Sequence, residues 1–291
     1  MPRELIALYQ NGNYTVKLYS NGTKIKQTTK ESFVAKFPDS IDLKITNYCD
    51  RNCPMCHEKS SKEGSHADLD APFLKTLKKG TELAIGGGNP LLHPKLLPFL
   101  KQMKSQGIIC NLTINEVHLK QSKTLVLDLI ENKLVYGLGV SLKAYDEEIV
   151  SFAKAHSNVV LHVINGVFTE YDKLASQGLK ILILGYKKFG RGKEYFSAEI
   201  EHQMNITREI LPGIIAGFKL VSFDNLALEQ LSVKSLISNR EFEQIYMGDD
   251  GEGTMYIDLV NSQFAKSSTS TERYPLQDEI IPMFKQIQVK K

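Results

Sequence analysis

Three of the four cysteines of this chain, Cys49, Cys53 and Cys56, lie within one short stretch. Thiolates are soft ligands, and iron–sulfur clusters in proteins are held by cysteine. A loop that presents three thiolates at spacings of four and three can wrap one corner of a [4Fe-4S] cube. It leaves the fourth iron without a protein ligand. The spacing therefore predicts a cluster site at which a small molecule can bind the open iron.

Two other interpretations of these cysteines stay open. His57 directly follows the last of them, so the four residues can form a Cys3His zinc site. Zinc modules usually bring two short ligand pairs from separated segments, whereas here all four ligands share one loop. Disulfides are disfavoured, because four cysteines in 291 residues without a secretory leader indicate a reducing compartment.

The composition is that of an ordinary globular protein, with 42% hydrophobic and 24% charged residues. The net charge of +3 is small and the basic residues are spread out, so a nucleic acid partner is not favoured. No apolar stretch approaches the roughly 18 residues of a membrane span, and the first residues lack the apolar core of a signal peptide. We expect a cytoplasmic protein with no membrane partner.

The first forty residues differ from the rest of the chain. Short runs rich in β-forming residues are separated by Asn-Gly turns, and this pattern is the strongest short-range signal for a hairpin. The runs span residues 6–9, 14–19 and 23–28. They predict an antiparallel β-meander over residues 1–40, which serves either as a lid on the bottom or edge of the next domain or as a platform for a partner.

From residue 41 onward, β-rich apolar runs alternate with helical patterns. The expected strands are 41–46, 82–86, 108–114, 136–142, 159–164 and 180–184, and the expected helices are 68–79, 94–105, 119–132, 146–155 and 169–176. This alternation is typical of βαβ units with a parallel sheet. It predicts an α/β fold, a partial (β/α)6 TIM-like barrel over residues 41–192. Such barrels carry their chemistry on the loops that follow the strands, and the cysteine loop follows the first strand.

The remaining residues, 193–291, are less regular. Residues 218–223 can form a seventh strand, and residues 253–259 and 263–267 can form a hairpin. We expect a C-terminal α+β extension that closes the barrel on the substrate side.

The cysteine loop together with a later glycine turn resembles the radical S-adenosylmethionine (radical SAM) superfamily. The loop has the CxxxCxxC spacing with an apolar residue, Met55, before the last cysteine. About thirty residues later, the second expected strand ends in Gly86, Gly87 and Gly88, where that superfamily has its "GGE" motif. The resemblance covers about residues 41–192 and departs from the motif at Asn89, which stands where an acidic residue is common.

The resemblance implies one [4Fe-4S] cluster on Cys49, Cys53 and Cys56, with SAM bound to the open iron through its amino and carboxylate groups. The glycine turn would bind the amino group, Asn89 would replace an ionic contact by an amide contact, and Met55 would pack against adenine. Further SAM contacts are expected from residues that end the later strands. These are Asn115, Ser141, Lys143, Asn165, Gly185 and Tyr186. The alternative for the polar members of this set is a helix N-cap or a turn residue.

The catalytic residues are not fixed by the sequence, and the candidates are His57, Glu58 and Lys187. The first two follow the last cysteine and can bind substrate, relay a proton or simply cap the loop. Lys187 lies with Arg191 in a basic loop after the sixth strand, which suits an anionic group of SAM or of the substrate. Cys110 is expected to be a buried small apolar residue.

By this resemblance the protein is an enzyme. An electron from reduced flavodoxin or ferredoxin would cleave SAM to a 5′-deoxyadenosyl radical, which abstracts hydrogen from an unidentified substrate. No second cysteine cluster follows Cys110, which favours a small-molecule or nucleotide substrate over a peptide. A peptide stays possible, because the meander can add a substrate strand at its edge. The alternative is a non-catalytic metal-binding scaffold or regulator with zinc in the same loop.

Overall fold

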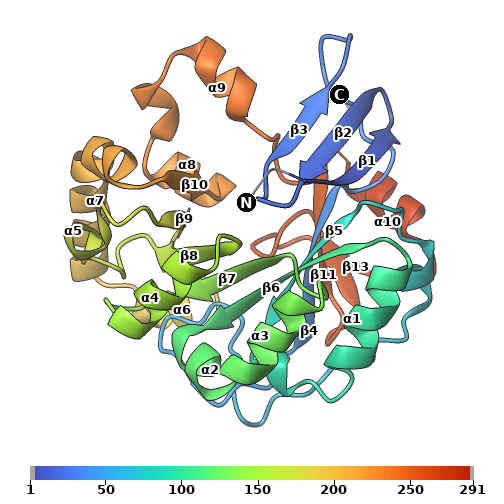
Figure 1. Ribbon diagram of the computed structural model, residues 1–291, viewed down its shortest axis with the longest axis horizontal. Helices are drawn as coiled ribbons and strands as arrows, with labels where there is room; N and C mark the ends of the chain where they lie inside the picture. The colour runs from blue at the N-terminus through green and yellow to red at the C-terminus, as the bar shows by residue number, and fades with distance from the viewer. Residues whose placement is uncertain (1–3, 289–291) are drawn as a thin grey trace.

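The computed structural model describes residues 4–288 and contains two β-sheets. The smaller sheet is antiparallel, with strand order β1-β2-β3, and consists of β1 (Leu5–Asn11), β2 (Tyr14–Tyr19) and β3 (Lys24–Gln27). It lies at one end of the molecule, opposite the loop that follows β4 (Figure 1). The larger sheet has ten strands in the order β10-β9-β8-β7-β6-β5-β4-β11-β12-β13.

Seven consecutive strands of the larger sheet are parallel to their neighbours. They are β4 (Ser40–Thr46), β5 (Glu82–Gly87), β6 (Ile109–Asn115), β7 (Gly137–Ser141), β8 (Val159–Ile164), β9 (Lys180–Leu184) and β10 (Leu220–Phe223). The first six begin and end within one residue of the strands expected from the sequence. The expected α/β class with a parallel sheet is therefore confirmed.

The count of six strand-helix units is too small. Strand β10 continues the parallel run beyond β9, and β11 (Thr254–Asp258) pairs in parallel with β4 at the other side. Two antiparallel strands, β12 (Gln263–Ala265) and β13 (Tyr274–Pro275), complete that edge. The C-terminal segment thus supplies strands to both edges of the sheet. The pairing of β11 with β4 joins residues more than two hundred positions apart, and local sequence patterns do not reveal such pairings.

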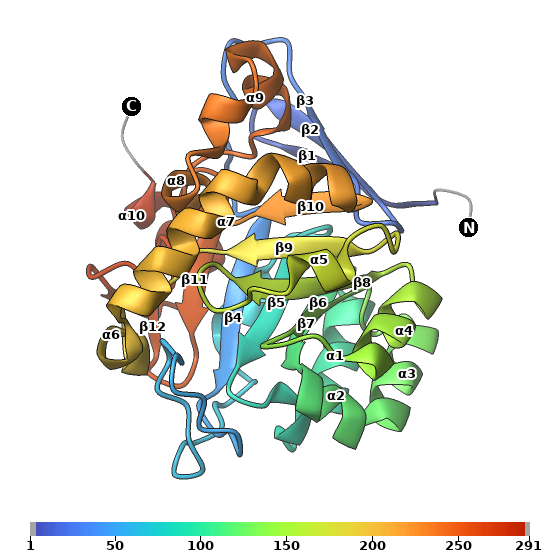
Figure 2. The ribbon, with the colours of Figure 1, turned by 90° about the vertical axis from the view of Figure 1, so that its left-hand side faces the viewer.

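Most of the helices lie on the outer face of the curved sheet, whereas α9 (Asn239–Ile245) lies at the end of the molecule that holds the small sheet (Figure 2). The helices are α1 (Leu96–Ser105), α2 (Glu116–Gln121), α3 (Lys123–Glu131), α4 (Glu147–Ala155), α5 (Tyr171–Leu174), α6 (Arg191–Tyr195), α7 (Ala198–Gly217), α8 (Asn225–Gln230), α9 and α10 (Ile280–Ile287), with the 3-10 turns η1 (Pro72–Thr76), η2 (Pro90–Leu92) and η3 (Val233–Leu236). In the described residues, no helix is long and apolar enough to cross a membrane.

Two expected helices are much shorter in the structure. The region 68–79 holds only η1, which begins at Pro72 and has no capping side chain. The region 169–176 holds only the four residues of α5, and Ser176 follows with a positive φ of 59°. A left-handed residue cannot continue an α-helix, so this segment turns directly toward β9.

The two faces of the parallel strands differ in character. On β4, Ile41, Leu43 and Ile45 are fully buried against the rest of the core, whereas Asp42 and Lys44 line a cavity on the opposite face. Parallel sheets usually bury apolar residues on both faces. Here the face away from the helices instead surrounds a lumen with polar and small side chains, and this lumen is where a ligand can bind.

The small sheet covers the end of the lumen at which the parallel strands begin. Lys24 of β3 forms an ion pair with Glu82 of β5, and Lys26 Nζ lies 2.8 Å from Asp39 Oδ2. Tyr14 Oη also donates to this Asp39 carboxylate over 2.6 Å. A cavity of about 280 Å³ lies between β2 and the strands of the barrel. These contacts fix the small sheet to the end of the barrel opposite the cysteine loop.

Candidate functional site

The cysteine loop leaves β4 and folds back onto the residues that follow it. The backbone N–H of Cys49 donates to Ser61 O over 2.8 Å, and Asn47 N–H donates to Ser65 O over 2.8 Å. Cys49 is buried, whereas Cys53 and Cys56 are half-buried, and all three are free thiols. They line one cavity of about 320 Å³ at the ends of the parallel strands. The three thiols that the sequence singled out therefore share one cavity.

The protein environment does not favour the thiolate form of Cys49 and Cys53. Burial raises the pKa of both thiols, and the negative charge of the neighbouring cysteines adds to this effect. A cysteine that coordinates a metal is deprotonated by the charge of that metal. These two residues consequently depend on a bound metal centre to become thiolates.

Arg191 holds the cysteine loop from the side of β9. Its Nε donates to Cys53 O over 2.9 Å, its Nη2 donates to Ser60 O over 2.9 Å, and its backbone N–H donates to Cys56 O over 3.1 Å. The preceding Gly190 has a φ of +55°, and a Cβ there would lie 2.4 Å from His57 O. The basic loop that the sequence suggested for an anionic ligand thus uses Arg191 to bind backbone carbonyls.

We expect Arg191→Ala to lower iron and sulfide incorporation several-fold after anaerobic reconstitution. The variant loses the two hydrogen bonds from the Arg191 guanidinium, each worth about 1.5–3 kcal/mol, and the loop is then less ordered before the metal binds. Arg191→Lys should restore incorporation only in part, because a lysine ammonium lacks the planar set of donors with which the guanidinium reaches two carbonyl groups at once. The measurement is iron and sulfide per chain, together with the rate of iron loss to a chelator.

Arg208→Ala is the matched control for this experiment. Arg208 also donates to a backbone carbonyl, that of Gln230, but does not contact the cysteine loop. Iron content in the Arg191→Ala protein equal to that of the Arg208→Ala protein would show that Arg191 does not order the loop.

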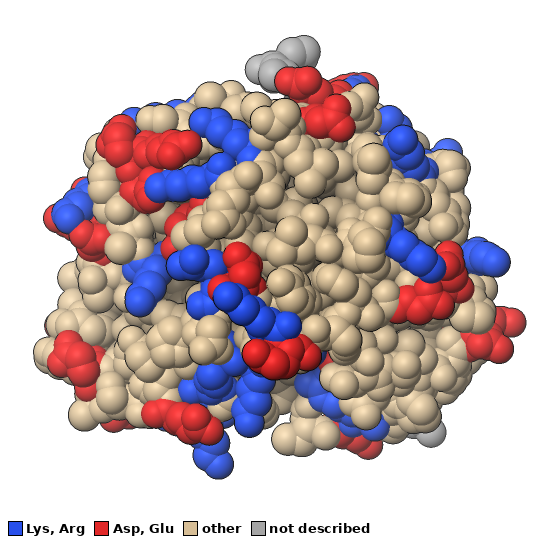
Figure 3. All heavy atoms as spheres, turned by 90° about the horizontal axis from the view of Figure 1, so that it is seen from below, with Lys and Arg blue, Asp and Glu red and all other residues tan. Residues whose placement is uncertain are grey.

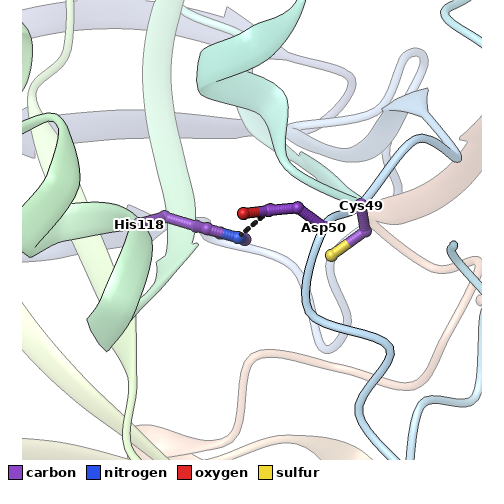
Figure 4. Close-up of side chains that lie close together, drawn as sticks. All are labelled: Cys49, Asp50 and His118. Carbon is purple, nitrogen blue, oxygen red and sulfur yellow. Dashed lines mark hydrogen bonds and ion pairs between the residues drawn. The ribbon is translucent and has the colours of Figure 1, made fainter. Parts of the chain in front are cut away.

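On the side of α2, Asp50 and His118 hold the other end of the loop (Figure 4). His118 Nε2 lies 2.8 Å from Asp50 Oδ1, and the imidazole is buried. Burial lowers the pKa of His118 although the Asp50 charge opposes this, so the neutral ring donates its Nε2–H to the carboxylate. Cys49, Asp50 and His118 place one ligand atom each within 4.8 Å of one another. Because the nitrogen and the carboxylate already bind each other, we interpret this pair as an anchor for the loop.

Asn89 belongs to this anchor and does not line the cavity. Its Oδ1 accepts from Leu91 N–H over 3.2 Å at the start of η2, and its Nδ2 lies 3.4 Å from Asp50 Oδ1. The side chain is 3% exposed. The contact between Asn89 and SAM therefore stays a prediction that this conformation does not favour.

The glycine turn lies beside the cysteine loop. Gly87 and Gly88 line the cavity with the three cysteines, and Gly86 lines an adjoining cavity. A Cβ at Gly87 or Gly88 would lie 2.2 Å from Thr46 O or 2.0 Å from Tyr48 O. A Cβ at Gly86 would meet no atom within 4 Å. The last two glycines are thus required for close backbone packing, whereas Gly86 leaves open space for a ligand.

The other expected SAM residues divide into two groups. Met55, Asn115, Ser141 and Lys143 line the cysteine cavity, and Asn115 also caps α2. Asn165 lines neither this cavity nor the adjoining one in the described residues. It is fully buried, and its Nδ2 donates to Gln230 Oε1 over 3.2 Å.

The adjoining cavity, which we call the chamber, has a volume of about 310 Å³. It contains the three catalytic candidates His57, Glu58 and Lys187, as well as Gly185 and Tyr186. The chamber shares Met55, His57, Gly87, Thr113, Ser141 and Ile164 with the cysteine cavity. An occupant of the chamber would therefore lie directly against a ligand bound beside the cysteines.

A network of charged groups forms one wall of the chamber. Lys44 Nζ lies 2.6 Å from Glu58 Oε2 and 3.1 Å from Asp258 Oδ2, and Tyr256 Oη donates to Glu58 Oε1 over 2.9 Å. Burial opposes ionisation of Glu58, but His57 and Lys44 outweigh it and hold the pKa of this carboxyl well below its usual range. Glu58 is therefore ionised and links the cysteine loop to β4 and β11.

Sequence reasoning missed several residues of the two cavities. Asp42 and Lys44 of β4, Thr113 of β6, Glu116 at the start of α2 and Tyr256 of β11 all line one of them. One signal for Asp42 and Lys44 was present. Charged residues alternate with apolar ones in this strand, although parallel strands are usually buried on both faces, and this pattern indicates a polar lumen.

The donor set fits a cluster and SAM better than it fits a single zinc ion. A tetrahedral zinc ion with bonds of about 2.3 Å holds its thiolates about 3.8 Å apart. In the described chain, no group of three or more metal-binding side chains within 4.8 Å of one another contains Cys53, Cys56 or His57. The three thiols therefore do not all lie as close together as the ligands of one zinc ion, which favours a larger metal centre. Glu116 adds a buried Oε2 without a hydrogen-bond partner in the cysteine cavity, where the ammonium or hydroxyl groups of SAM can donate to it.

The surface around this site shows no dominant charge. The loop after β4 lies at the lower end of the molecule in Figures 1 and 2, and Figure 3 shows that face with basic and acidic side chains intermixed. Nucleic-acid-binding proteins usually present a continuous basic surface. This face therefore gives no support to a nucleic acid partner.

Comparison with known proteins identifies the domain. Residues 43–175 match the family model described as "Radical SAM superfamily". A curated protein of Pyrococcus furiosus, "Tungsten-containing aldehyde ferredoxin oxidoreductase cofactor-modifying protein", is 30% identical over 141 residues. That match spans 45% of this chain and 36% of the relative, so the chain matches little more than a third of that protein's length.

Two solved structures of SuiB from Streptococcus suis have a similar fold. SuiB bound to the precursor peptide SuiA matches with a TM-score of 0.61 and 11% identity, over 97% of this chain and 88% of SuiB. SuiB bound to S-adenosylmethionine matches with a TM-score of 0.55 and 15% identity, over 83% of this chain and 64% of SuiB. At these identities the likeness concerns the fold.

The parallel barrel, the cysteine loop and the family match together define the class of protein. Residues 43–175 of the chain carry a radical SAM domain, which confirms the resemblance seen in the sequence. The superfamily consists of enzymes, and it implies a [4Fe-4S] cluster and SAM as cofactors.

Proposed function

We propose that this protein reductively cleaves S-adenosylmethionine at a [4Fe-4S] cluster held by Cys49, Cys53 and Cys56, and that it modifies a substrate in the chamber by hydrogen abstraction. The observation that carries this proposal is the position of the three thiols, which share a cavity with the glycine turn at the ends of the parallel strands. When bound, the cluster would pass one electron to SAM and release methionine and a 5′-deoxyadenosyl radical.

The residues of the chain would bind and orient these cofactors. Arg191 and the Asp50–His118 pair order the loop so that the thiols are available without a large rearrangement. Gly86 leaves room for SAM, and Glu116 offers a buried carboxylate oxygen without a partner to its donors. Met55 lines both the cysteine cavity and the chamber and is our candidate for contact with adenine. We retain Asn115, Ser141 and Lys143 as further candidates.

We propose that the substrate is a peptide. The support is the similarity over 97% of this chain to SuiB bound to its precursor peptide. The P. furiosus relative is named as cofactor-modifying, so a small molecule is the alternative, and it was the class favoured from the sequence. We keep a reduced flavodoxin or ferredoxin as the proposed electron donor. We also keep the proposed division into residues 1–40, 41–192 and 193–291.

A direct test is the metal content and SAM chemistry of the anaerobically reconstituted protein. We expect a brown protein with about four irons and four sulfides per chain, the content of one cube, and 5′-deoxyadenosine after addition of SAM and dithionite. A colourless protein with one zinc ion per chain would instead support the metal-binding scaffold. A brown protein that forms no 5′-deoxyadenosine would contradict the proposed reaction while leaving the cluster assignment intact.

A further inference from the structure

Asp42 is an ionisable residue of the chamber for which neither the cluster nor SAM gives a role. It lies on β4, opposite Ala84 of β5 and Tyr256 of β11 in the strand register. Its side chain faces the open chamber, whereas its neighbours Ile41 and Leu43 are buried on the opposite face. In the described part of the chain, its carboxylate forms no hydrogen bond and no ion pair.

Negatively charged side chains outnumber positively charged ones among the groups that affect Asp42. Asp42 is accessible to solvent within the lumen, and the surrounding protein raises its pKa to about 6. Lys187 opposes this shift, whereas Asp250 and Asp224 add to it. A carboxyl with this pKa is mostly ionised at neutral pH, so the chamber contains a negative charge that its own cations do not pair.

The two lysines of the chamber are bound elsewhere. Lys44, the next residue of β4 on the same face, lies between Glu58 and Asp258. Lys187 Nζ donates to Ser268 Oγ over 2.9 Å. An incoming cation would therefore find Asp42 free, whereas an incoming anion would find no free lysine and would meet the field of Asp42, Asp224 and Asp250.

We propose that the chamber binds a cationic group of the substrate, a protonated amine or a guanidinium, and that Asp42 is the residue that selects it. Asp42 is accessible in the chamber and has no hydrogen-bond or ion-pair partner among the described residues, so its carboxylate can form a charge-assisted hydrogen bond with an incoming cation. The chamber also contains Met55 and Gly86, so a cation held by Asp42 would bring its neighbouring carbon atoms close to the SAM site. This inference rests on the proposed function and names the substrate class for that site.

The test uses reconstituted protein with SAM and three small probes of similar size. Two are cationic, N-acetyl-L-lysine methylamide and N-acetyl-L-arginine methylamide, and the third, N-acetyl-L-norleucine methylamide, is neutral. Binding is measured by calorimetry. We expect at least one cationic probe to bind the wild-type protein at least about tenfold more tightly than the neutral probe, which corresponds to about 1.4 kcal/mol.

Three variants assign this selectivity to Asp42. Asp42→Asn should remove the preference for the cationic probe, and Asp42→Glu should keep part of it because a carboxylate remains. Asp172→Asn, which removes an exposed carboxylate on α5, is the matched control and should bind as the wild type does. Iron content and melting temperature confirm that each variant is folded and loaded.

The proposal is wrong if the neutral probe binds the wild-type protein as tightly as both cationic probes, or if Asp42→Asn keeps the full preference. Either result can occur in a protein that still forms 5′-deoxyadenosine, and the proposed function would then stand. Absence of 5′-deoxyadenosine from the loaded wild-type protein would instead contradict the proposed function. The two failures are therefore distinguishable.

Discussion

Replacing any one of Cys49, Cys53 and Cys56 by Ala is expected to abolish cluster assembly. A cube held at three corners loses a third of its protein ligands with each replacement. Asp50 and His118, whose ligand atoms lie within 4.8 Å of Cys49 Sγ, already bind each other, so they are poorly placed to substitute for a missing thiolate. The measurement is iron and sulfide per chain after anaerobic reconstitution, together with the visible absorption of the protein.

Cys110→Ala is the matched control for these replacements. Cys110 lies on β6, is 1% exposed and packs in the hydrophobic core, and burial raises the pKa of its thiol to about 12. Its removal should cost about 1 kcal/mol of stability and leave the iron content unchanged. A cluster that survives Cys53→Ala but not Cys110→Ala would show that the ligands are wrongly assigned.

Gly86→Val is expected to block SAM cleavage while the cluster still assembles. The new side chain would enter open space where the chamber adjoins the cysteine cavity, because the next residue, Gly87, lines both cavities and a Cβ at Gly86 meets no protein atom within 4 Å. It would therefore displace a ligand without disturbing the fold. We expect 5′-deoxyadenosine formation to fall about a hundredfold, because small errors in the position of a reacting group have effects of this size. The measurements are 5′-deoxyadenosine under dithionite and SAM binding by equilibrium dialysis.

Gly86 is a better position for this test than its two neighbours. Gly87 has a φ of +116°, and a side chain at Gly87 or Gly88 would overlap the backbone of the cysteine loop or of β4. Replacement there would damage the fold and the cluster together. Gly213→Val is the control, because a Cβ at Gly213 of α7 would also meet no atom within 4 Å but would lie on an exposed helix face. If the Gly86→Val protein forms 5′-deoxyadenosine at the wild-type rate, SAM does not bind beside this glycine.

The features that the sequence predicted well depend on local signals. The spacing of the three cysteines is fixed by the chain itself, and their side chains reach one cavity because the loop between them is short. The first six parallel strands were found because short apolar runs rich in β-branched residues favour strands, whatever they pair with. The glycine turn was visible for the same reason, since consecutive glycines mark a place where backbone segments approach closely.

Even within these local motifs, the roles of single residues depended on the fold. Asn89 stands at the position of an expected SAM ligand, yet its amide caps η2 and contacts Asp50. Arg191 resembles an anion-binding residue in the sequence, yet its guanidinium orders the cysteine loop. A side chain has several possible partners of similar energy, and the choice among them is made by whatever lies nearby in the folded chain.

The sequence by itself indicated the class of the domain, singled out the three cysteines that share one cavity and located the parallel strands that carry them. Only the tertiary structure decided what surrounds the chamber. Lys44 meets Asp258 across 214 positions of sequence, and β11 adds Tyr256 to a wall begun by β4. Among the described residues, the same arrangement leaves Asp42 without a partner. Hydrophobic patterning specifies which face of a strand is buried, but the pairing of polar groups on the other face depends on which distant strands become neighbours.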